Sequence, residues 1–215
     1  MGPALQRKRI PAKTTRRPLR AVPSGNVVSC GAAEGGADRE TVAAACAEAS
    51  ALGVAEPCNF NCPGQIVIGG EKAAVERAAA LARERGARRC MPLKVSGPFH
   101  TSLLKPAGDA LHRRFETVAF REPKIPVLHN CLGGQRAAED TIPALLERQV
   151  QSSVYMEDCI RAMAALGVDA MVEIGPGRAL SGFVKKTLPG FPVLAVETAE
   201  EVEKLPELLK EVESR

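Results

Sequence analysis

Strand-like and helix-like segments alternate in a regular order between Gly25 and Val95, and this order constrains the fold more than any other feature of the sequence. Runs of apolar and β-branched residues bounded by turn residues predict strands, and apolar residues at helical spacing predict helices between them. The predicted strands are 26–30, 57–61, 65–68 and 89–95, and the predicted helices are 39–52 and 71–85. The resulting order, βαββαβ, is that of a ferredoxin-like subdomain.

The second half of the chain also alternates strands with helices. It predicts strands over 125–129, 170–174 and 193–196, and helices over 102–118, 142–150, 154–166, from 178 onward and over 200–213. Such alternation is typical of parallel sheets, which are covered on both faces and have several strands. Three strands are few, so we expect this half to be part of a larger sheet. The predicted fold class is α/β (α+β), with a basic head over 1–24, a ferredoxin-like subdomain over 25–95 and a partial α/β domain over 96–215.

The net charge of +4 originates at the N-terminal end of the chain. Residues 1–20 hold seven Lys and Arg and no acidic residue, which leaves 22 basic and 25 acidic residues elsewhere, a net charge of −3. Such a segment could bind nucleic acid or an anionic membrane. It has no apolar periodicity, however, and the chain has one Tyr and no Trp to stack on bases. We therefore expect a disordered head, with no nucleic-acid or membrane partner.

The seven cysteines indicate neither a disulfide framework nor a metal site. Their number is odd, and the closest pair, Cys58 and Cys62, is not a Cys-x-x-Cys. No apolar run approaches the ~20 residues that cross a membrane, and no segment near residue 1 resembles a secretory signal. We expect reduced thiols, no metal ion and no cofactor in a cytoplasmic protein.

The motif Gly97-Pro98-Phe99-His100 follows the predicted strand 89–95 and places a histidine on a rigid turn. Histidine is the side chain whose ordinary pKa suits a general base near neutral pH. From position alone, a histidine that caps the following helix is the alternative. His112 and His129 are expected to be structural. No Gly-x-Ser-x-Gly, the signature of a serine nucleophile elbow, occurs in the 215 residues.

Two further segments could contribute to a site. Gln149 ends the predicted helix 142–150, where its amide could accept the N–H of an imidazole, although an ordinary polar helix residue is the simpler interpretation. The segment Gly175-Pro176-Gly177-Arg178 lies between a strand and a helix, so its backbone amides could face an anion. Its spacing matches neither a P-loop nor a dinucleotide fingerprint, which favours a tight turn. Lys185 and Lys186 add positive charge nearby.

Three segments also carry a family resemblance. They are 59–68 (NFNCPGQIVI), 95–107 (VSGPFHTSLLKPA) and 173–186 (EIGPGRALSGFVKK). Together, and in this order, they closely resemble the malonyl-CoA:acyl-carrier-protein transacylases of bacterial fatty acid synthesis, with similarity from about residue 21 to about residue 194. In that family a ferredoxin-like subdomain is inserted into an α/β-hydrolase-like domain that carries the active site.

The resemblance implies transfer of malonyl from coenzyme A to a serine, and then to the phosphopantetheine thiol of acyl carrier protein. Malonyl-CoA is then a substrate, and no cofactor is implied. His100 matches the base that activates the serine, and Gln149 matches the glutamine whose carbonyl orients that base. Phe99 resembles the aromatic residue that crowds a 2-methyl group in malonyl-selective members.

The family's Gly-His-Ser-Leu-Gly elbow and Gly-Gln-Gly oxyanion loop are absent from the 215 residues, and no arginine is assigned to the malonyl carboxylate. We therefore interpret the chain as the C-terminal portion of a transacylase, truncated or frame-shifted near residue 25. It would lack an N-terminal half and be inactive alone. The alternative is a non-catalytic module that binds the acidic carrier protein through Arg178, Lys185 and Lys186.

Overall fold

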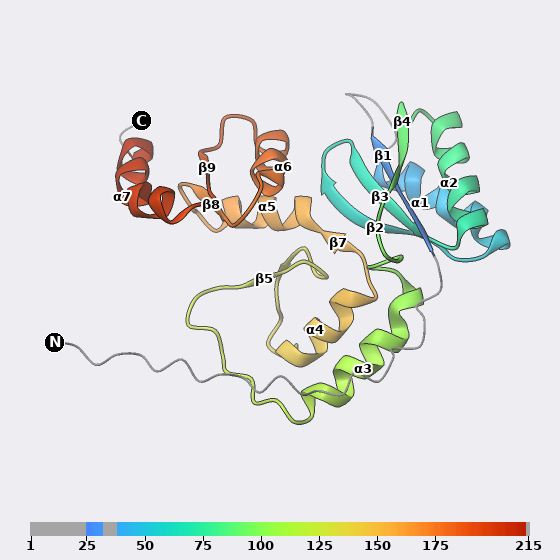
Figure 1. Ribbon diagram of the computed structural model, residues 1–215, viewed down its shortest axis with the longest axis horizontal. Helices are drawn as coiled ribbons and strands as arrows, with labels where there is room; N and C mark the ends of the chain where they lie inside the picture. The colour runs from blue at the N-terminus through green and yellow to red at the C-terminus, as the bar shows by residue number, and fades with distance from the viewer. Residues whose placement is uncertain (1–24, 32–37, 214–215) are drawn as a thin grey trace.

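The computed structural model describes residues 25–31 and 38–213, which form a mixed α/β fold (Figure 1). A sheet with two covering helices makes up one part, the helices α3 and α4 lie side by side next to it, and α5 leads away from it toward β8, β9, α6 and α7. The predicted basic head, residues 1–24, lies outside the described residues.

The first part has its elements in the order βαββαβ. They are β1 (Asn26–Gly31), α1 (Arg39–Ala49), a short 3-10 helix (Ser50–Leu52), β2 (Ala55–Cys62), β3 (Gln65–Gly70), α2 (Lys72–Glu84) and β4 (Arg89–Leu93). These four strands are antiparallel to their neighbours, in the order β4-β1-β3-β2. The local sequence explains the turns: Asp38 accepts a hydrogen bond from the Thr41 amide at 2.8 Å and caps α1, and Gly64 has a φ of 71°, as the β2–β3 turn requires.

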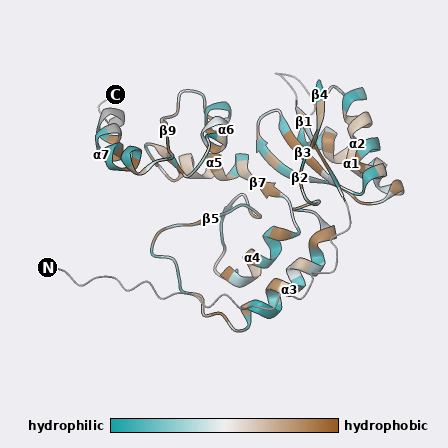
Figure 2. Cartoon of the chain, in the orientation of Figure 1, coloured by the Kyte–Doolittle hydropathy of each residue, from teal (hydrophilic) through white to brown (hydrophobic). Residues whose placement is uncertain are grey.

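The helices α1 and α2 cover one face of this sheet, and the main hydrophobic core lies between them. Hydrophobic residues run along the central strands (Figure 2), and Ile68, Val42 and Val75 are almost completely buried. Leu52, the last residue of the predicted helix 39–52, is instead 57% exposed. The α-helix ends at Ala49, and the tighter 3-10 turn that follows changes the angle between successive side chains.

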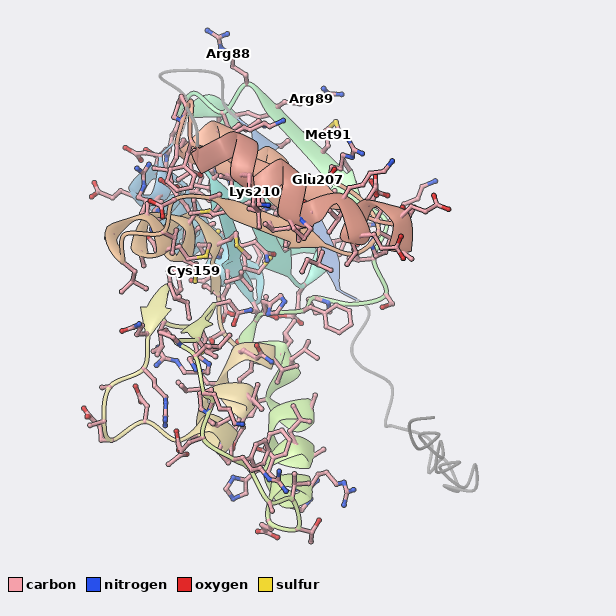
Figure 3. All side chains as sticks on the ribbon, turned by 90° about the vertical axis from the view of Figure 1, so that its left-hand side faces the viewer. Arg88, Arg89, Met91, Cys159, Glu207 and Lys210 are labelled. Carbon is pink, nitrogen blue, oxygen red and sulfur yellow. The ribbon has the colours of Figure 1, made fainter. Side chains whose placement is uncertain are left out.

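The strand β4 is an edge strand whose outer side carries charge. Arg88 and Arg89 point away from it into solvent, beside the exposed Met91 (Figure 3). Pro92 lies in the same strand and donates no ladder hydrogen bond. Charges and proline are features that keep an edge from pairing with another chain.

A fifth strand joins this sheet from the second half of the chain, and the sequence did not reveal it. Residues 154–166 were predicted to be one helix, but β7 (Val154–Tyr155) comes first and pairs in parallel with Asn59 and Phe60 of β2. The helix α5 (Met156–Ala165) begins only after it. Stacking explains the difference: the rings of Phe60 and Tyr155 lie 5.2 Å apart at their centroids, which stabilises the position of Tyr155 beside β2.

The remaining elements of the second half are short. They are a 3-10 helix (Ser102–Leu104), α3 (Lys105–Phe115), β5 (Leu128–His129), β6 (Gly134–Gln135), α4 (Ile142–Val150), β8 (Met171–Ile174), α6 (Ala179–Thr187), β9 (Val193–Val196) and α7 (Ala199–Glu213). The strands β8 and β9 are parallel, and β5 pairs with β6 in a hairpin.

The predicted strand 125–129 was therefore wrong in extent and in partner. Only Leu128 and His129 are paired, with β6 and not with β8. Pro126 within the predicted strand has no N–H for a ladder, and the amides of Leu132 and Gly133 both donate to the His129 carbonyl, which turns the chain back on itself. Among the described strands, the predicted three-stranded parallel layer is thus reduced to the pair β8–β9.

Candidate functional site

His100 lies on a strained turn between β4 and the helix α3. Its φ of 63° is in the left-handed region, the one such value for a non-glycine residue among those the structure describes. Thr101 stabilises the turn: it is fully buried, and its hydroxyl donates a hydrogen bond to the Pro98 carbonyl at 2.7 Å. Strain of this kind, held by surrounding structure, occurs frequently at functional sites.

Two hydrogen bonds attach His100 to the C-terminal end of α4. Its Nδ1 lies 2.7 Å from the main-chain oxygen of Gln149, and its backbone N–H donates to the Val150 carbonyl at 3.2 Å. A carbonyl can only accept, so Nδ1 carries the proton and Nε2 of the neutral ring keeps its lone pair. The geometry therefore prepares Nε2 to accept a proton.

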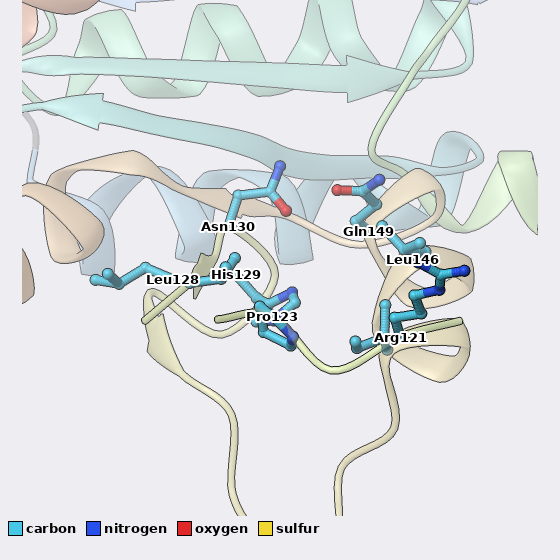
Figure 4. Close-up of a pocket in the computed structure, with 9 residues that line it drawn as sticks. Arg121, Pro123, Leu128, His129, Asn130, Leu146 and Gln149 are labelled. Atoms are coloured by element: carbon cyan, nitrogen blue, oxygen red, sulfur yellow. The ribbon is translucent and has the colours of Figure 1, made fainter. Parts of the chain in front are cut away.

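The structure brings His100 and Gln149 together, but through the main chain of Gln149 and not through the side-chain amide that the sequence suggested. The side chain of Gln149 instead lines a pocket of about 500 Å³. Figure 4 shows Asn130 and Gln149 at one rim of this pocket, with Arg121 and Pro123 at the other. The sequence singled out neither Arg121 nor Asn130, because a lone Arg in a loop and an Asn after a strand carry no distinctive signal.

Neither the pocket nor the cysteines offer a nucleophile within the described part of the chain. The nine residues that line the pocket include no Ser, Thr or Cys. All seven cysteines are free and buried. Burial raises the pKa of Cys58 and Cys46 to about 12 and that of Cys159 to about 11, so these thiols remain protonated near neutral pH.

Phe99 precedes His100 and is 45% exposed. Its amide donates to the Gly97 carbonyl at 2.9 Å, which fixes the turn. The other histidines have local partners. His112 Nδ1 lies 2.9 Å from Glu147 and links α3 to α4, and the His129 carbonyl accepts the turn amides of its hairpin.

Carboxylates of this chain accept hydrogen bonds from backbone amides in and just after the turn 175–178. Glu173 accepts hydrogen bonds from the amides of Leu180 and Ser181 at 3.1 and 2.7 Å, which lowers its pKa, and Glu197 accepts from the Gly177 amide at 3.2 Å. The amides that could have faced a bound anion are thus satisfied internally. Arg178 also pairs with Glu197 at 3.1 Å, whereas Lys185 and Lys186 are exposed and form no ion pair with the residues that the structure describes.

Within residues 25–31 and 38–213, no group of three or more His, Cys, Asp or Glu could hold a metal ion. Over the same ranges, the helices fall short of the length and apolar character that crossing a membrane requires.

No protein-family model matches this chain. The malonyl CoA-acyl carrier protein transacylase of Escherichia coli strain K12 is 42% identical over 166 residues, which are 77% of this chain and 53% of the relative. The enzyme of the same name from Bacillus subtilis strain 168 is 41% identical over 153 residues, 71% of this chain and 48% of the relative. The chain spans about half the length of the curated relatives it matches.

Solved structures agree with this result. A malonyl CoA-acyl carrier protein transacylase from Clostridium perfringens superposes with a TM-score of 0.82 at 37% identity, over 89% of this chain and 59% of that one. An acyl carrier protein S-malonyltransferase from Vibrio cholerae gives 0.78 at 37% identity, over 87% and 60%. A malonyl-transacylase solved in complex with a type II PKS acyl-carrier protein gives 0.78 at 35% identity, over 86% and 59%. About two fifths of each solved chain therefore has no counterpart in this one.

The hydrogen bond between His100 and Gln149 leads to a direct prediction. Gln149→Ala keeps the main-chain acceptor, so the proton should stay on Nδ1. The ¹⁵N chemical shifts of the His100 ring, measured at a pH where the ring is neutral, should match those of the unmodified protein, with His100→Ala used to assign the signals. A shift to a mixture of tautomers in Gln149→Ala would show instead that the side-chain amide is the acceptor.

Proposed function

Because this chain is a homologue of the malonyl CoA-acyl carrier protein transacylases, we propose that it supplies the base and part of the substrate pocket for malonyl transfer from coenzyme A to acyl carrier protein. The observation that carries the proposal is the orientation of His100 by the Gln149 main chain. It supports the roles of base for His100 and of orienting residue for Gln149. The site lies in a chain 42% identical to an E. coli transacylase over 166 residues.

In the first half-reaction, His100 Nε2 takes the proton of a serine hydroxyl as the serine oxygen attacks the thioester carbonyl of malonyl-CoA. The tetrahedral intermediate collapses, the carbon–sulfur bond breaks, and the imidazolium returns the proton to the departing thiolate of coenzyme A. In the second half-reaction the phosphopantetheine thiol of the carrier gives its proton to Nε2 and attacks the malonyl ester. The serine leaves and regains the proton, so atoms and charge balance over the cycle.

The serine of this scheme comes from outside the 215 residues, because they contain no Gly-x-Ser-x-Gly elbow. The raised pKa values of Cys46, Cys58 and Cys159 argue against a thiol in its place. We therefore propose that the 215-residue chain alone does not transfer malonyl. Residues 25–95 would correspond to the ferredoxin-like subdomain and residues 96–215 to part of the α/β-hydrolase-like domain. The seven free thiols support a cytoplasmic location.

A second candidate function is binding of acyl carrier protein without catalysis. The exposed Lys185 and Lys186 support it, as does the complex between a related malonyl-transacylase and an acyl-carrier protein. Arg178 contributes less than the sequence suggested, because Glu197 already pairs with its guanidinium. A binding module of this kind would hold the carrier and transfer nothing, even beside a serine-bearing partner.

Complementation tests the proposal. The part of the E. coli relative that this chain does not match, which holds the serine elbow in that family, is co-expressed with the full chain, and radiolabelled malonyl transfer from malonyl-CoA to carrier protein is measured. We expect transfer that His100→Ala lowers by roughly 10²- to 10⁴-fold, the usual contribution of general acid–base catalysis. His112→Ala is the control, since the ring of His112 pairs with Glu147 and does not line the pocket, and it should leave the rate little changed.

The opposite results are equally clear. Equal activity of the His100→Ala and His112→Ala complexes would contradict the proposed role of His100 as the general base. Covalent malonylation of the 215-residue chain alone would contradict its dependence on an external serine. Carrier binding without transfer by the complemented chain would favour the binding module.

The exposed ring of Phe99 gives a prediction about specificity. Beside the base, it would crowd a 2-methyl group on the substrate, so Phe99→Ala should relax the preference for malonyl-CoA over methylmalonyl-CoA. One methyl group in a pocket is worth about 10- to 200-fold in kcat/KM, so we expect a change of about tenfold or more in that ratio. The complemented assay above, run with both substrates, measures it. An unchanged ratio would place the discriminating contact elsewhere.

A further inference from the structure

Two cysteines lie opposite each other on neighbouring strands of the sheet. Cys30 of β1 pairs with Cys90 of β4 in the antiparallel register, and both side chains belong to the main hydrophobic core. Their sulfur atoms are 2.7 Å apart. Non-bonded carbon atoms pack best at about 3.5–4.0 Å, and sulfur is the larger atom, so this contact is unusually close for two free thiols.

The strand pairing supplies the geometry that a disulfide needs. Residues directly opposite each other in an antiparallel pair have Cα atoms about 4.5–5.5 Å apart, and disulfides join Cα atoms about 4.4–6.8 Å apart. Because a disulfide S–S bond is about 2.05 Å long, the sulfur atoms of Cys30 and Cys90 need to approach by only about 0.7 Å. The backbones of the two strands can therefore stay in place when the bond forms.

The other five cysteines have different surroundings. Three of them donate to an oxygen atom at 3.6–3.7 Å: Cys62, Cys131 and Cys159. Cys46 of α1 shares the core cluster with Cys30, but no strand pairing places it opposite Cys30. Cys30 and Cys90 are 60 positions apart in the sequence, which is why the number and spacing of the cysteines there indicated no disulfide.

The two thiols of the pair differ in their access to solvent. Cys30 is 3% exposed, and burial, followed by the contact with Cys90, raises its pKa far above the ordinary value. Cys90 is 7% exposed on the edge strand, between Arg89 and Met91, which point to solvent (Figure 3). The Arg83 guanidinium donates to the Cys90 carbonyl at 2.8 Å and so places a positive charge beside the pair. A small oxidant therefore reaches Cys90 first.

We propose that Cys30 and Cys90 form an oxidisable pair, which hydrogen peroxide converts into a disulfide between β1 and β4. The Cys90 sulfur, as its thiolate, attacks one peroxide oxygen, the O–O bond breaks, and a sulfenic acid and hydroxide form. The Cys30 sulfur then displaces the sulfenic hydroxyl, and the S–S bond forms as water leaves. In total, the two thiols lose two electrons and two protons, and the peroxide is reduced to two molecules of water.

The bond ties an edge strand to its neighbour. Among the described strands, β4 pairs only with β1, and the turn that carries His100 begins soon after β4 ends at Leu93. Oxidation therefore restrains the strand that leads into the candidate site, and a dithiol releases it. Disulfides in reducing compartments are usually transient, which agrees with the free thiols of the structure. The inference does not depend on the proposed function.

Thiol counting and peptide mapping on the full chain test the proposal. The folded protein is treated with hydrogen peroxide, denatured, alkylated with N-ethylmaleimide and digested. The untreated chain should take up seven labels and the oxidised chain five, with one peptide pair joined through Cys30 and Cys90. Dithiothreitol should restore all seven labels.

Two variants show which thiol reacts. Cys90→Ala should slow the loss of the Cys30 thiol by about tenfold or more, because the accessible partner is gone. Cys159→Ala is the matched control: this cysteine is 6% exposed, and its removal should leave the loss of two labels intact.

A crosslink between Cys30 and Cys46, or a modified Cys90 without a crosslink, would overturn the inference. Equal behaviour of Cys90→Ala and Cys159→Ala would do the same. So would formation of the crosslink at an equal rate in the chain unfolded by guanidinium chloride, because the strand register would then play no part. A Cys30 to Cys90 crosslink that forms in the folded chain and is reversed by dithiothreitol would support it.

Discussion

The pairing of β7 with β2 holds the candidate site together. Only two residues, Val154 and Tyr155, form this strand, yet they attach the second half of the chain to the sheet of the first. Arg39 strengthens the junction: its guanidinium lies 4.9 Å from the centre of the Phe60 ring and pairs with Asp158 at 2.7 Å and Glu157 at 3.2 Å. Ring stacking contributes about 0.5–1.5 kcal/mol and an exposed cation–π contact about 0.5–1 kcal/mol.

This junction lies close in sequence to the hydrogen-bond acceptors of His100. The C-terminal end of α4, which supplies the Gln149 and Val150 carbonyls to His100, lies only four residues before Val154. Ser153 lies between them and donates its hydroxyl to the Pro57 carbonyl of β2 at 2.7 Å. The Tyr155 amide donates to the Asn130 carbonyl at 2.8 Å, and Asn130 lines the pocket. The strand β7 therefore also positions one rim of the pocket. A distant strand pairing thus connects the histidine turn, its acceptor and the pocket.

The sequence predicted the βαββαβ order of elements and identified the histidine turn, because long periodic helices and Pro-Gly turns are local signals. It did not predict β7, since two residues are too few to show a strand period and Val154 continues the apolar stripe of α5. It suggested the side-chain amide of Gln149 as a possible acceptor, whereas the main-chain oxygen lies 2.7 Å from His100 Nδ1, and a main-chain acceptor does not depend on residue type. The error at 125–129 has a related cause. Pro126 has no N–H for a ladder, and the amides of Leu132 and Gly133 turn the chain back at His129, so only the last two residues pair.

The most direct test of this account is native-state hydrogen exchange at the His100 amide, which donates to Val150, and at the Phe60 and Tyr155 amides, compared between the unmodified chain and Tyr155→Ala. If the β7–β2 pairing holds the site together, these amides belong to one cooperative unit. Tyr155→Ala should then lower protection at His100 and at Phe60 by the same factor. Unchanged protection at His100 with loss at Phe60 would show that the histidine turn is held independently of β7, and would contradict the account.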